Sequence, residues 1–296
     1  MNERNEHFAR ARLFATIEGG SQFWARELAQ TGSPSRLIEE ILERKFDDRS
    51  KSAPAIAERI IHIDGEEVIA EIESSGGFFL TPEDQDWPNQ LSDLKAPPFG
   101  LVGRGERQSL SRLTESISIV GTRNPTTYGV RLAGDFAAGA VDLGWSVISG
   151  GAYGIDGAAH RGALVAEGIT CAVLASGISN NYPAGHVGLF DQIVEEGILL
   201  SEVMPKVSAV PARFLLRNRL IAALSRGTVV VEAAARSGSL RTAREAAEIL
   251  RLVMAVPGSV QTPTSEGCHR LIAERCAELV TSIGDVMDLV LPLTTE

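Results

Sequence analysis

The sequence predicts an α/β protein, in which a doubly wound, mostly parallel sheet follows a small helical domain. Two patterns lead to this fold class. From residue 117 onward, short runs of valine and isoleucine alternate with helical segments, and strands buried on both faces require such uninterrupted apolar runs. In the first part of the chain, apolar residues recur at helical spacing instead. We therefore place a domain boundary near Gly76, with a helical domain over 1–76 and the sheet domain over 77–296.

Short helices fill the first domain. Apolar residues at helical spacing run through 7–46, and glycine, serine and proline interrupt them at 19–21 and 32–34. Two more helices are expected at about 54–62 and 65–73.

Six units of a strand and a helix make up the second domain. Each strand is a short apolar run, and each following helix carries apolar residues on one face. The expected strands are SISIV, WSVIS, TCAVLAS, ILLSE, TVVVEA and LVMAV. The expected helices span 128–142, 155–167, 186–196, 213–225, 240–250 and 267–275. In such a sheet, ligands bind beyond the carboxyl ends of the strands.

The composition favours a cytoplasmic protein without a bound metal or cofactor. The 296 residues carry a net charge of -10, and no apolar run approaches the roughly 18 residues that cross a bilayer. The start MNERNEHFAR has no apolar signal region, so we expect a cytoplasmic location and no membrane contact. Cys171, Cys268 and Cys276 have no Cys-x-x-Cys spacing, which predicts buried reduced thiols and neither disulfides nor a zinc site.

Glycine-rich loops follow several strands at one edge of the predicted sheet. They are Gly121-Thr122-Arg123, Gly150-Gly151-Ala152, Ser176-Gly177 and Ser237-Gly238-Ser239. Glycine lets backbone amides approach a ligand, and the helix N-termini that follow add partial positive charge. Each loop alone is also what a tight strand-to-helix turn needs. Together, and with an arginine in the first, the loops predict an anion-binding site.

Several nucleotide and catalytic motifs are absent from the sequence. It contains no Gly-Lys dipeptide, which excludes a Walker A loop, and no G-x-G-x-x-G, which argues against a redox dinucleotide. It has neither a G-x-S-x-G elbow nor an H-E-x-x-H zinc motif. His160 lies one turn after Asp156, and we interpret it as a packing or capping residue in preference to a catalytic base.

Seven motifs, taken in order, resemble those of the DNA-processing protein A family, also called DprA or Smf. The motifs are SIVGTRNPTTYG, SGGAYGIDGAAHRGAL, TCAVLASGISNNYPAGH, LLSEVMP, RFLLRNRLIAALS, VVVEAAARSGSLRTAREA and VMAVPG. The segments LTPEDQDWPNQL and PPFGLVGRG, which precede the first motif, also resemble those of the family, with Trp87 in place of a tyrosine. The resemblance implies an extended Rossmann-like domain that binds single-stranded DNA as a homodimer. It further implies that the protein protects incoming DNA, loads RecA recombinase during natural transformation and has no catalytic activity.

The resemblance also implies roles for individual residues. Arg123 would contact a backbone phosphate, Phe214 would lie between bases, and Arg217 and Arg219 would line the pocket. Arg213 is the nearby cation where many relatives have a lysine. The expected DNA-binding residues are Gly121, Thr122, Arg123, Gly150, Gly151, Arg213, Phe214, Arg217, Asn218, Arg219, Ser237, Gly238, Ser239 and Thr242.

Other interpretations of the arginines and of Phe214 stay open at this point. Phe214 also fits a core position at the start of an amphipathic helix. Arg217 and Arg219 also fit a solvated helix face or an ion pair with Glu202 or Glu232.

A rival function is that of a nucleotide phosphoribohydrolase of the lysine-decarboxylase-like type. Glu245 lies one turn after Thr242, as part of that enzyme's PGGxGTxxE motif would require, but the stretch ARSGSLRTAREA has no Pro-Gly-Gly. Release of free base from AMP would establish this alternative.

Two further expectations concern the end of the chain. We expect the dimer surface on the last helices, about 240–250 and 267–275, because Leu271 and Ile272 exceed what the sheet can cover. A sequence ending at residue 296 is expected to lack the C-terminal winged-helix domain that some family members carry.

Overall fold

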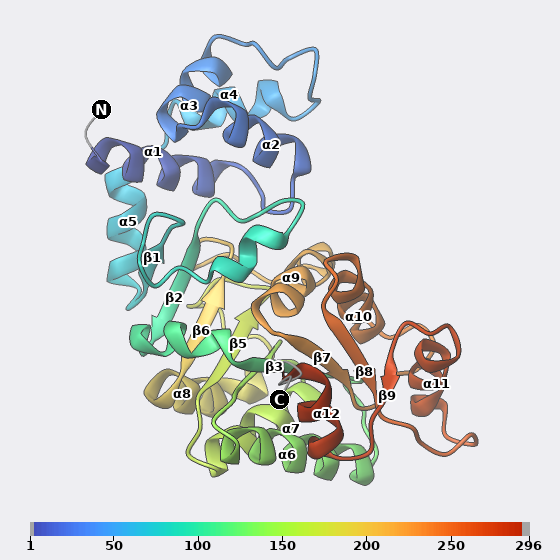
Figure 1. The fold of residues 1–296 in the computed structure, drawn as a ribbon. Coiled ribbons are helices and arrows are strands. Elements are labelled where there is room, and N and C mark those ends of the chain that lie inside the picture. The colour runs from blue at the N-terminus through green and yellow to red at the C-terminus, as the bar shows by residue number, and fades with distance from the viewer. Residues whose placement is uncertain (1–2, 292–296) are drawn as a thin grey trace, which may run out of the picture.

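Five helices form the first part of the computed structural model, which describes residues 3–291 (Figure 1). Ser21 and Ser33 begin two of these helices, because their side chains accept hydrogen bonds from the free amides of the first turn. Asp64 caps the fifth helix in the same way. Their apolar faces enclose one core around Leu13 and Trp24. The helices are α1 (Glu3–Thr16), α2 (Gln22–Thr31), α3 (Pro34–Leu42), α4 (Ala53–Ile60) and α5 (Gly65–Ser74).

The rest of the protein is built around a nine-stranded sheet with the strand order β1-β2-β6-β5-β4-β3-β7-β8-β9. The central strands pair in parallel, for example with Val120 opposite Val230, whereas β2 pairs antiparallel with β1 and β6. The strands are β1 (Phe78–Leu80), β2 (Leu101–Gly105), β3 (Ser116–Val120), β4 (Ser146–Ser149), β5 (Thr170–Leu174), β6 (Ile198–Ser201), β7 (Gly227–Val230), β8 (Leu252–Ala255) and β9 (Glu278–Leu279).

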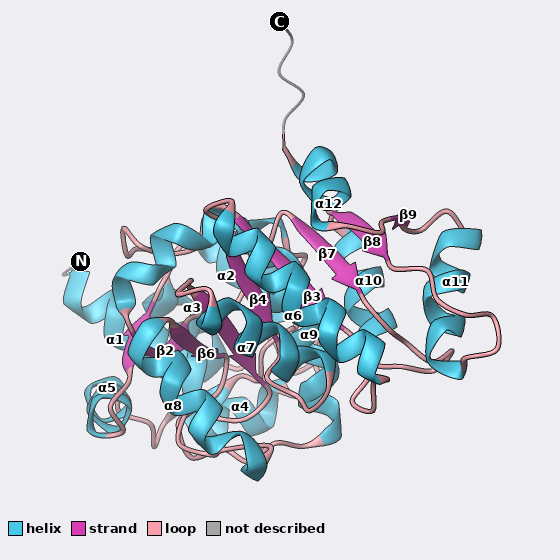
Figure 2. Ribbon diagram, turned by 90° about the horizontal axis from the view of Figure 1, so that it is seen from below, coloured by secondary structure: helices cyan, strands magenta, loops and turns pink. Residues whose placement is uncertain are grey.

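Helices cover both faces of the sheet, which confirms the predicted doubly wound α/β fold (Figure 2). On one face lie α6 (Thr127–Asp142), α7 (Ile155–Val165), α8 (Val187–Glu196) and α12 (Ile283–Val290). On the other lie α9 (Pro211–Leu224), α10 (Ser239–Glu248) and α11 (Glu266–Ala273). Short 3-10 helices connect some elements: η1 (Asn89–Asp93), η2 (Arg107–Thr114), η3 (Ala184–His186) and η4 (Pro263–Ser265).

Alternate residues of the central strands face opposite helical layers. Cys171 and Val173 of β5 pack in the core beneath α9, whereas Ala172 and Leu174 pack in the core beneath α8. Because both faces are covered, every residue of β5 is buried. The uninterrupted apolar run of this strand is the physical result of that double burial.

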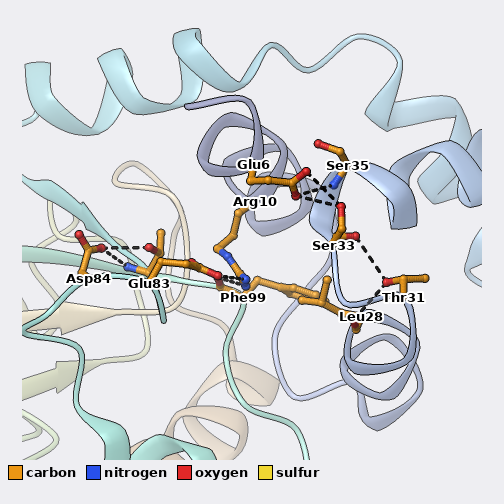
Figure 3. A network of polar contacts seen from close by, with 10 residues as sticks. Glu6, Arg10, Leu28, Thr31, Ser33, Ser35, Glu83, Asp84 and Phe99 are labelled. Carbon is orange, nitrogen blue, oxygen red and sulfur yellow. Dashed lines mark hydrogen bonds and ion pairs between the residues drawn. The ribbon is translucent and has the colours of Figure 1, made fainter. Parts of the chain in front are cut away.

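The helical domain contacts the start of the sheet domain through both apolar and polar groups. Phe99 belongs to the core of the helical domain, and its carbonyl oxygen accepts a hydrogen bond of 3.3 Å from the Arg10 guanidinium of α1. The same guanidinium pairs with Glu83 at 2.5 Å, and Figure 3 shows this network. Glu6, one turn earlier, accepts from the Ser33 hydroxyl of the α3 cap at 3.0 Å. The boundary near Gly76 falls between α5 and β1, and the independence of the two domains stays a prediction.

His160 and the cysteines are structural. His160 is fully buried, and its Nδ1 lies 2.7 Å from the Thr170 hydroxyl, which confirms the packing interpretation. Burial lowers the pKa of His160 to about 3, and nearby positive groups act in the same direction. Cys171, Cys268 and Cys276 are all free thiols; the first two are buried and the third is half-buried. No helix within residues 3–291 is long and apolar enough to cross a membrane.

The last helices differ in one respect from the predicted dimer surface. Leu271 of α11 is 2% exposed and belongs to the core that covers the sheet, with Ile272 packed against it. Leu271 is therefore used inside the protein, whereas Leu250, at the end of the expected 240–250 segment, is 94% exposed. A homodimer itself stays a prediction.

Candidate nucleic-acid interface

A pocket of about 380 Å³ lies beyond the carboxyl ends of β3 and β7. These two strands are neighbours, but the chain leaves β3 toward α6 on one face and leaves β7 toward α10 on the other. Such a divergence opens a crevice in which α/β sheets bind their ligands. The loops after β3 and β7 and the first half of α9 line this pocket. Its position agrees with the edge that the glycine-rich loops indicated.

Most of the residues that the sequence singles out come together at this pocket. Its lining includes Gly121, Thr122, Arg123, Phe214, Arg217, Asn218, Ser237, Gly238, Ser239 and Thr242. The side-chain amide of Asn218 donates to the Gly238 carbonyl at 3.3 Å, which joins α9 to the loop after β7. Contact of these residues with DNA stays a prediction.

Glu232 holds the loop after β3 in place. Glu232 is 3% exposed, and its carboxylate accepts hydrogen bonds from the Thr126 amide at 2.9 Å and from the Thr126 hydroxyl at 2.6 Å. Its carbonyl oxygen also accepts from the Thr122 amide at 2.7 Å. The Thr122 amide is thus already bonded inside the protein, and so is the Ser237 amide, which donates to Ala234. The loop amides consequently offer fewer free donors than the glycine-rich pattern suggested.

Phe214 and Arg123 meet at the mouth of the pocket. The guanidinium carbon of Arg123 lies 4.9 Å from the centroid of the Phe214 ring, which is a cation–π distance. Arg123 is exposed, Phe214 is half-buried, and Phe214 does not belong to the hydrophobic cores formed by residues 3–291. The structure therefore does not support a core role for Phe214.

Arg217 anchors α9 to the ends of the strands. One of its guanidinium nitrogens donates to the carbonyl oxygens of Gly150, after β4, and Val173, in β5. A Cβ atom at Gly150 would lie 2.6 Å from that nitrogen, so the close approach requires glycine. The next residue, Gly151, has a φ of 71°, in the left-handed region that favours glycine. Gly150 and Gly151 thus lie outside the pocket lining and support Arg217 and the loop.

The charge state of Arg217 reflects its burial. The residue is 6% exposed, and burial lowers its pKa to about 10, with the carboxylate of Asp156 opposing that shift. It therefore stays a cation at neutral pH. Its Nε is buried and has no hydrogen-bond partner among the described residues.

Arg219 and Arg213 differ from the expectation that they contribute to the pocket. Arg219 lies two residues after Arg217, and such positions on a helix do not share a face. Its guanidinium pairs with Glu202 at 2.5 Å and donates to the Ala96 carbonyl at 2.8 Å, which bears out the alternative of an ion pair with Glu202. Arg213 pairs with Glu18 of the helical domain at 2.8 Å.

The sequence interpretation missed two charged residues of the pocket. Arg236 is exposed and directly precedes the Ser237 loop, so its position after the fifth predicted strand could have indicated it. Asp156 is buried at the start of α7, and burial raises the pKa of its carboxyl, with Arg217 and Arg123 opposing the shift. Three arginines and one carboxyl group therefore line the pocket, which favours an anionic ligand.

The carboxylate that the rival enzyme would use lies elsewhere. Glu245 of α10 pairs with Arg241 at 2.6 Å and lines a different cavity, together with Arg219. Over residues 3–291, no three histidine, cysteine or acidic side chains gather as a metal site requires. The polar lining of the pocket thus consists of arginines, hydroxyl groups, one amide and one buried carboxyl group, beside one aromatic ring and several aliphatic side chains.

Comparison with known proteins assigns the family. The family model described as DNA recombination-mediator protein A matches residues 78–291. A DNA processing protein DprA of Mycobacterium tuberculosis is 45% identical over 226 residues, which are 73% of this chain and 58% of that protein. This chain thus spans little more than half the length of that relative. The DNA processing protein DprA of Streptococcus pneumoniae is 37% identical over 235 residues, or 79% of this chain and 81% of that protein.

Solved structures agree with this assignment. The X-ray structure of DNA processing protein A from Streptococcus pneumoniae superposes with a TM-score of 0.81 at 31% identity, covering 96% of this chain and 97% of that one. A Helicobacter pylori DNA processing protein A, whose structure describes its single-stranded DNA binding mode, gives a TM-score of 0.65 at 27% identity. The match covers 72% of this chain and 95% of that one. By sequence and by fold, the chain is a member of the DNA recombination-mediator protein A family, to which the DprA and Smf proteins belong.

Proposed function

We propose that the pocket between β3, β7 and α9 binds single-stranded DNA. The observation that carries this proposal is the half-buried Phe214 ring beside the exposed Arg123, within a pocket lined by three arginines. An aromatic ring and cations together suit a single strand, because its bases are free to stack and its phosphates are anionic. Membership of a family that includes a single-stranded DNA-binding protein from Helicobacter pylori supports the same ligand.

Selectivity for single strands follows from the shape and charge of the site. A duplex keeps the faces of its bases stacked inside, so that Phe214 would have no base to contact. The protein as a whole carries a net charge of -10, which repels a long polyanion. Attraction is therefore confined to the pocket, where Arg123, Arg217 and Arg236 lie.

We further propose that this protein acts in DNA recombination as a homodimer, by protecting incoming single strands and loading RecA recombinase onto them during natural transformation. Its family is described as that of DNA recombination-mediator protein A, which supports such a role. Two linked pockets would raise the avidity for one strand, because the second contact becomes intramolecular. The proposal assigns the protein no catalytic activity and a cytoplasmic location.

An electrophoretic mobility shift with matched oligonucleotides tests this function. Purified protein is titrated against oligo-dT and against a blunt duplex of mixed sequence and equal length. We expect a complex with the single strand at much lower protein concentration than with the duplex. Equal binding to both, or no binding to either, would refute the proposal, and release of free adenine from AMP would favour the rival enzyme.

The homodimer and the loading of RecA are tested by separate measurements. Sedimentation of the protein at tens of micromolar, with and without oligo-dT, is expected to give a dimer. RecA loading is tested by the rate of RecA ATP hydrolysis on single strands already covered by a single-strand-binding protein. We expect the protein to shorten the lag of that reaction, and an unchanged lag would contradict the RecA proposal alone.

A further inference from the structure

Tyr182 lies beside the pocket and is not among the residues that line it. Its ring centroid is 5.4 Å from that of Phe214, and the two ring planes are inclined at 64°. We propose that Tyr182 is a second stacking platform, which holds the base adjacent to the one at Phe214. This inference rests on the proposed binding of single-stranded DNA.

Three separate elements bring the two rings and one cation together. Tyr182 belongs to the segment between β5 and α8, Phe214 to the first turn of α9, and Arg123 to the loop after β3. All three segments lie at the edge of the sheet where the parallel strands end. Arg123 lies 4.9 Å from the Phe214 centroid, so the cation and both rings form one continuous surface.

Its exposure and its contact with Phe214 together distinguish Tyr182 from the other exposed tyrosines. Tyr182 is 45% exposed even though its ring contacts that of Phe214. Tyr153 is similarly exposed, at 47%, but its hydroxyl accepts from the Gly185 amide at 3.1 Å and its ring packs against His186. Among the described tyrosines, Tyr182 is the one whose ring contacts Phe214.

The inclination of the rings indicates two bases and not one. Two parallel rings can enclose a single base, whereas rings inclined at 64° present faces in different directions. The pocket volume of about 380 Å³ is at the small end of ligand pockets, which suits one nucleotide. The next base of the strand must therefore lie outside the pocket, and the exposed ring of Tyr182 is next to its mouth. Stacking accepts any base, so the second platform adds affinity without sequence preference.

A ladder of oligonucleotides tests the position of the second platform. Competition against a labelled oligo-dT gives the affinity of thymidine monophosphate and of oligo-dT that grows one nucleotide at a time. For Tyr182→Ala we expect wild-type affinity for the mononucleotide and about 5-fold to 100-fold weaker binding of longer strands, the loss typical of one stacked base. Tyr182→Phe keeps the ring and is expected to bind like wild type. Tyr128→Ala is the control, because Tyr128 is 53% exposed on α6 and has no ring contact with Phe214.

Fluorescence supplies a direct readout of stacking. The native tryptophans Trp24, Trp87 and Trp145 are buried, with exposures of 1%, 7% and 6%. The substitution Tyr182→Trp therefore adds an exposed indole, whose emission reports on its own contacts. We expect oligo-dT to quench this added emission and the mononucleotide to leave it unchanged.

The outcomes separate this inference from the proposed function. If wild type binds strands but Tyr182→Ala is unaffected at every length, the second platform is wrong and the pocket stands. If Tyr182→Ala weakens the mononucleotide as much as longer strands, Tyr182 acts by supporting Phe214, which also overturns the inference. Failure of wild type to bind any single strand would overturn the proposed function and this inference together.

Discussion

The guanidinium of Arg219 donates to both carboxylate oxygens of Glu202, at 2.5 and 2.6 Å. The two side chains are 8% and 10% exposed, so this ion pair is withdrawn from solvent. Arg217, two residues earlier on α9, instead contacts strand carbonyls and lines the pocket. These two arginines of α9 thus have different roles: Arg219 forms a buried ion pair, and Arg217 lines the pocket.

Replacement of Arg219 by alanine is expected to destabilise the fold. The change leaves Glu202 buried without its partner, which typically costs about 3–5 kcal/mol. Burial already raises the pKa of Glu202, and Arg219 opposes that shift. Denaturation in urea measures the free energy of unfolding. Arg270→Ala is the control, because its pair with Glu274 is exposed and such pairs contribute about 1 kcal/mol or less. Equal stability of the two variants would contradict a structural role for Arg219.

Arg123→Ala is expected to weaken binding of single-stranded DNA without loss of stability. Arg123 is exposed, so its removal leaves no buried group unpaired. A charge-assisted contact with phosphate typically contributes about 1.5–3 kcal/mol. Fluorescence anisotropy with labelled oligo-dT measures the affinity, and Arg131→Ala, an exposed arginine on α6, is the control. An unchanged affinity would show that Arg123 does not contact the DNA.

The salt dependence of binding is expected to be shallow. Arg123 and Arg236 are the exposed arginines of the pocket, whereas Arg217 is bonded to carbonyl oxygens and Arg219 lies elsewhere. Two phosphate contacts per site give a slope of log K against log salt of about -1.4, from about -0.7 for each phosphate on single strands. The test is a titration of a short oligonucleotide across a salt series. A slope steeper than about -5 per site would require an extended basic surface.

Acid is expected to destabilise the protein partly through His160. Its folded pKa of about 3 is below the ordinary 6.5, so the unfolded chain binds a proton that the folded chain excludes. Above pH 6.5 the side chain is neutral in both states, and the free energy of unfolding has its full value. As the pH falls from 6.5 toward about 3, the unfolded chain gains the proton and the free energy of unfolding decreases. Between these values one proton changes the free energy of unfolding by about 1.4 kcal/mol per pH unit. Urea denaturation at several pH values should therefore show a flatter profile for His160→Gln than for wild type. Identical profiles would exclude His160 as a source of the acid sensitivity.

The central strands could be predicted from the sequence because double burial leaves a strong pattern. The run SISIV of β3 has no exposed residue, and the same holds for TCAVL of β5. By contrast, β1 has three residues, β2 contains Gly103 and Gly105, and β9 has two residues. Such short or glycine-containing strands carry no periodic signal, and their pairing depends on residues distant in the sequence.

The site could be predicted as a set of loops but not in its side-chain directions. The parallel topology places the ends of β3 and β7 together, so Gly121 and Gly238 were expected at one edge. The direction of Arg219 depends on the rotation of α9 about its axis, which packing against the sheet and Glu202 determines. Sequence spacing alone left the pocket and the ion pair as alternatives, and only the tertiary contacts decide between them.

Crosslinking of bound DNA locates the site most directly. Irradiation of the protein with an oligonucleotide that contains iodouracil, followed by mass spectrometry, identifies the peptides that contact the bases. We expect adducts in the segment that contains Phe214, and we expect Phe214→Ala to remove them while the protein stays folded. Adducts confined to the helical domain or to α11, with none near Phe214, would contradict the assignment of the pocket as the DNA-binding site.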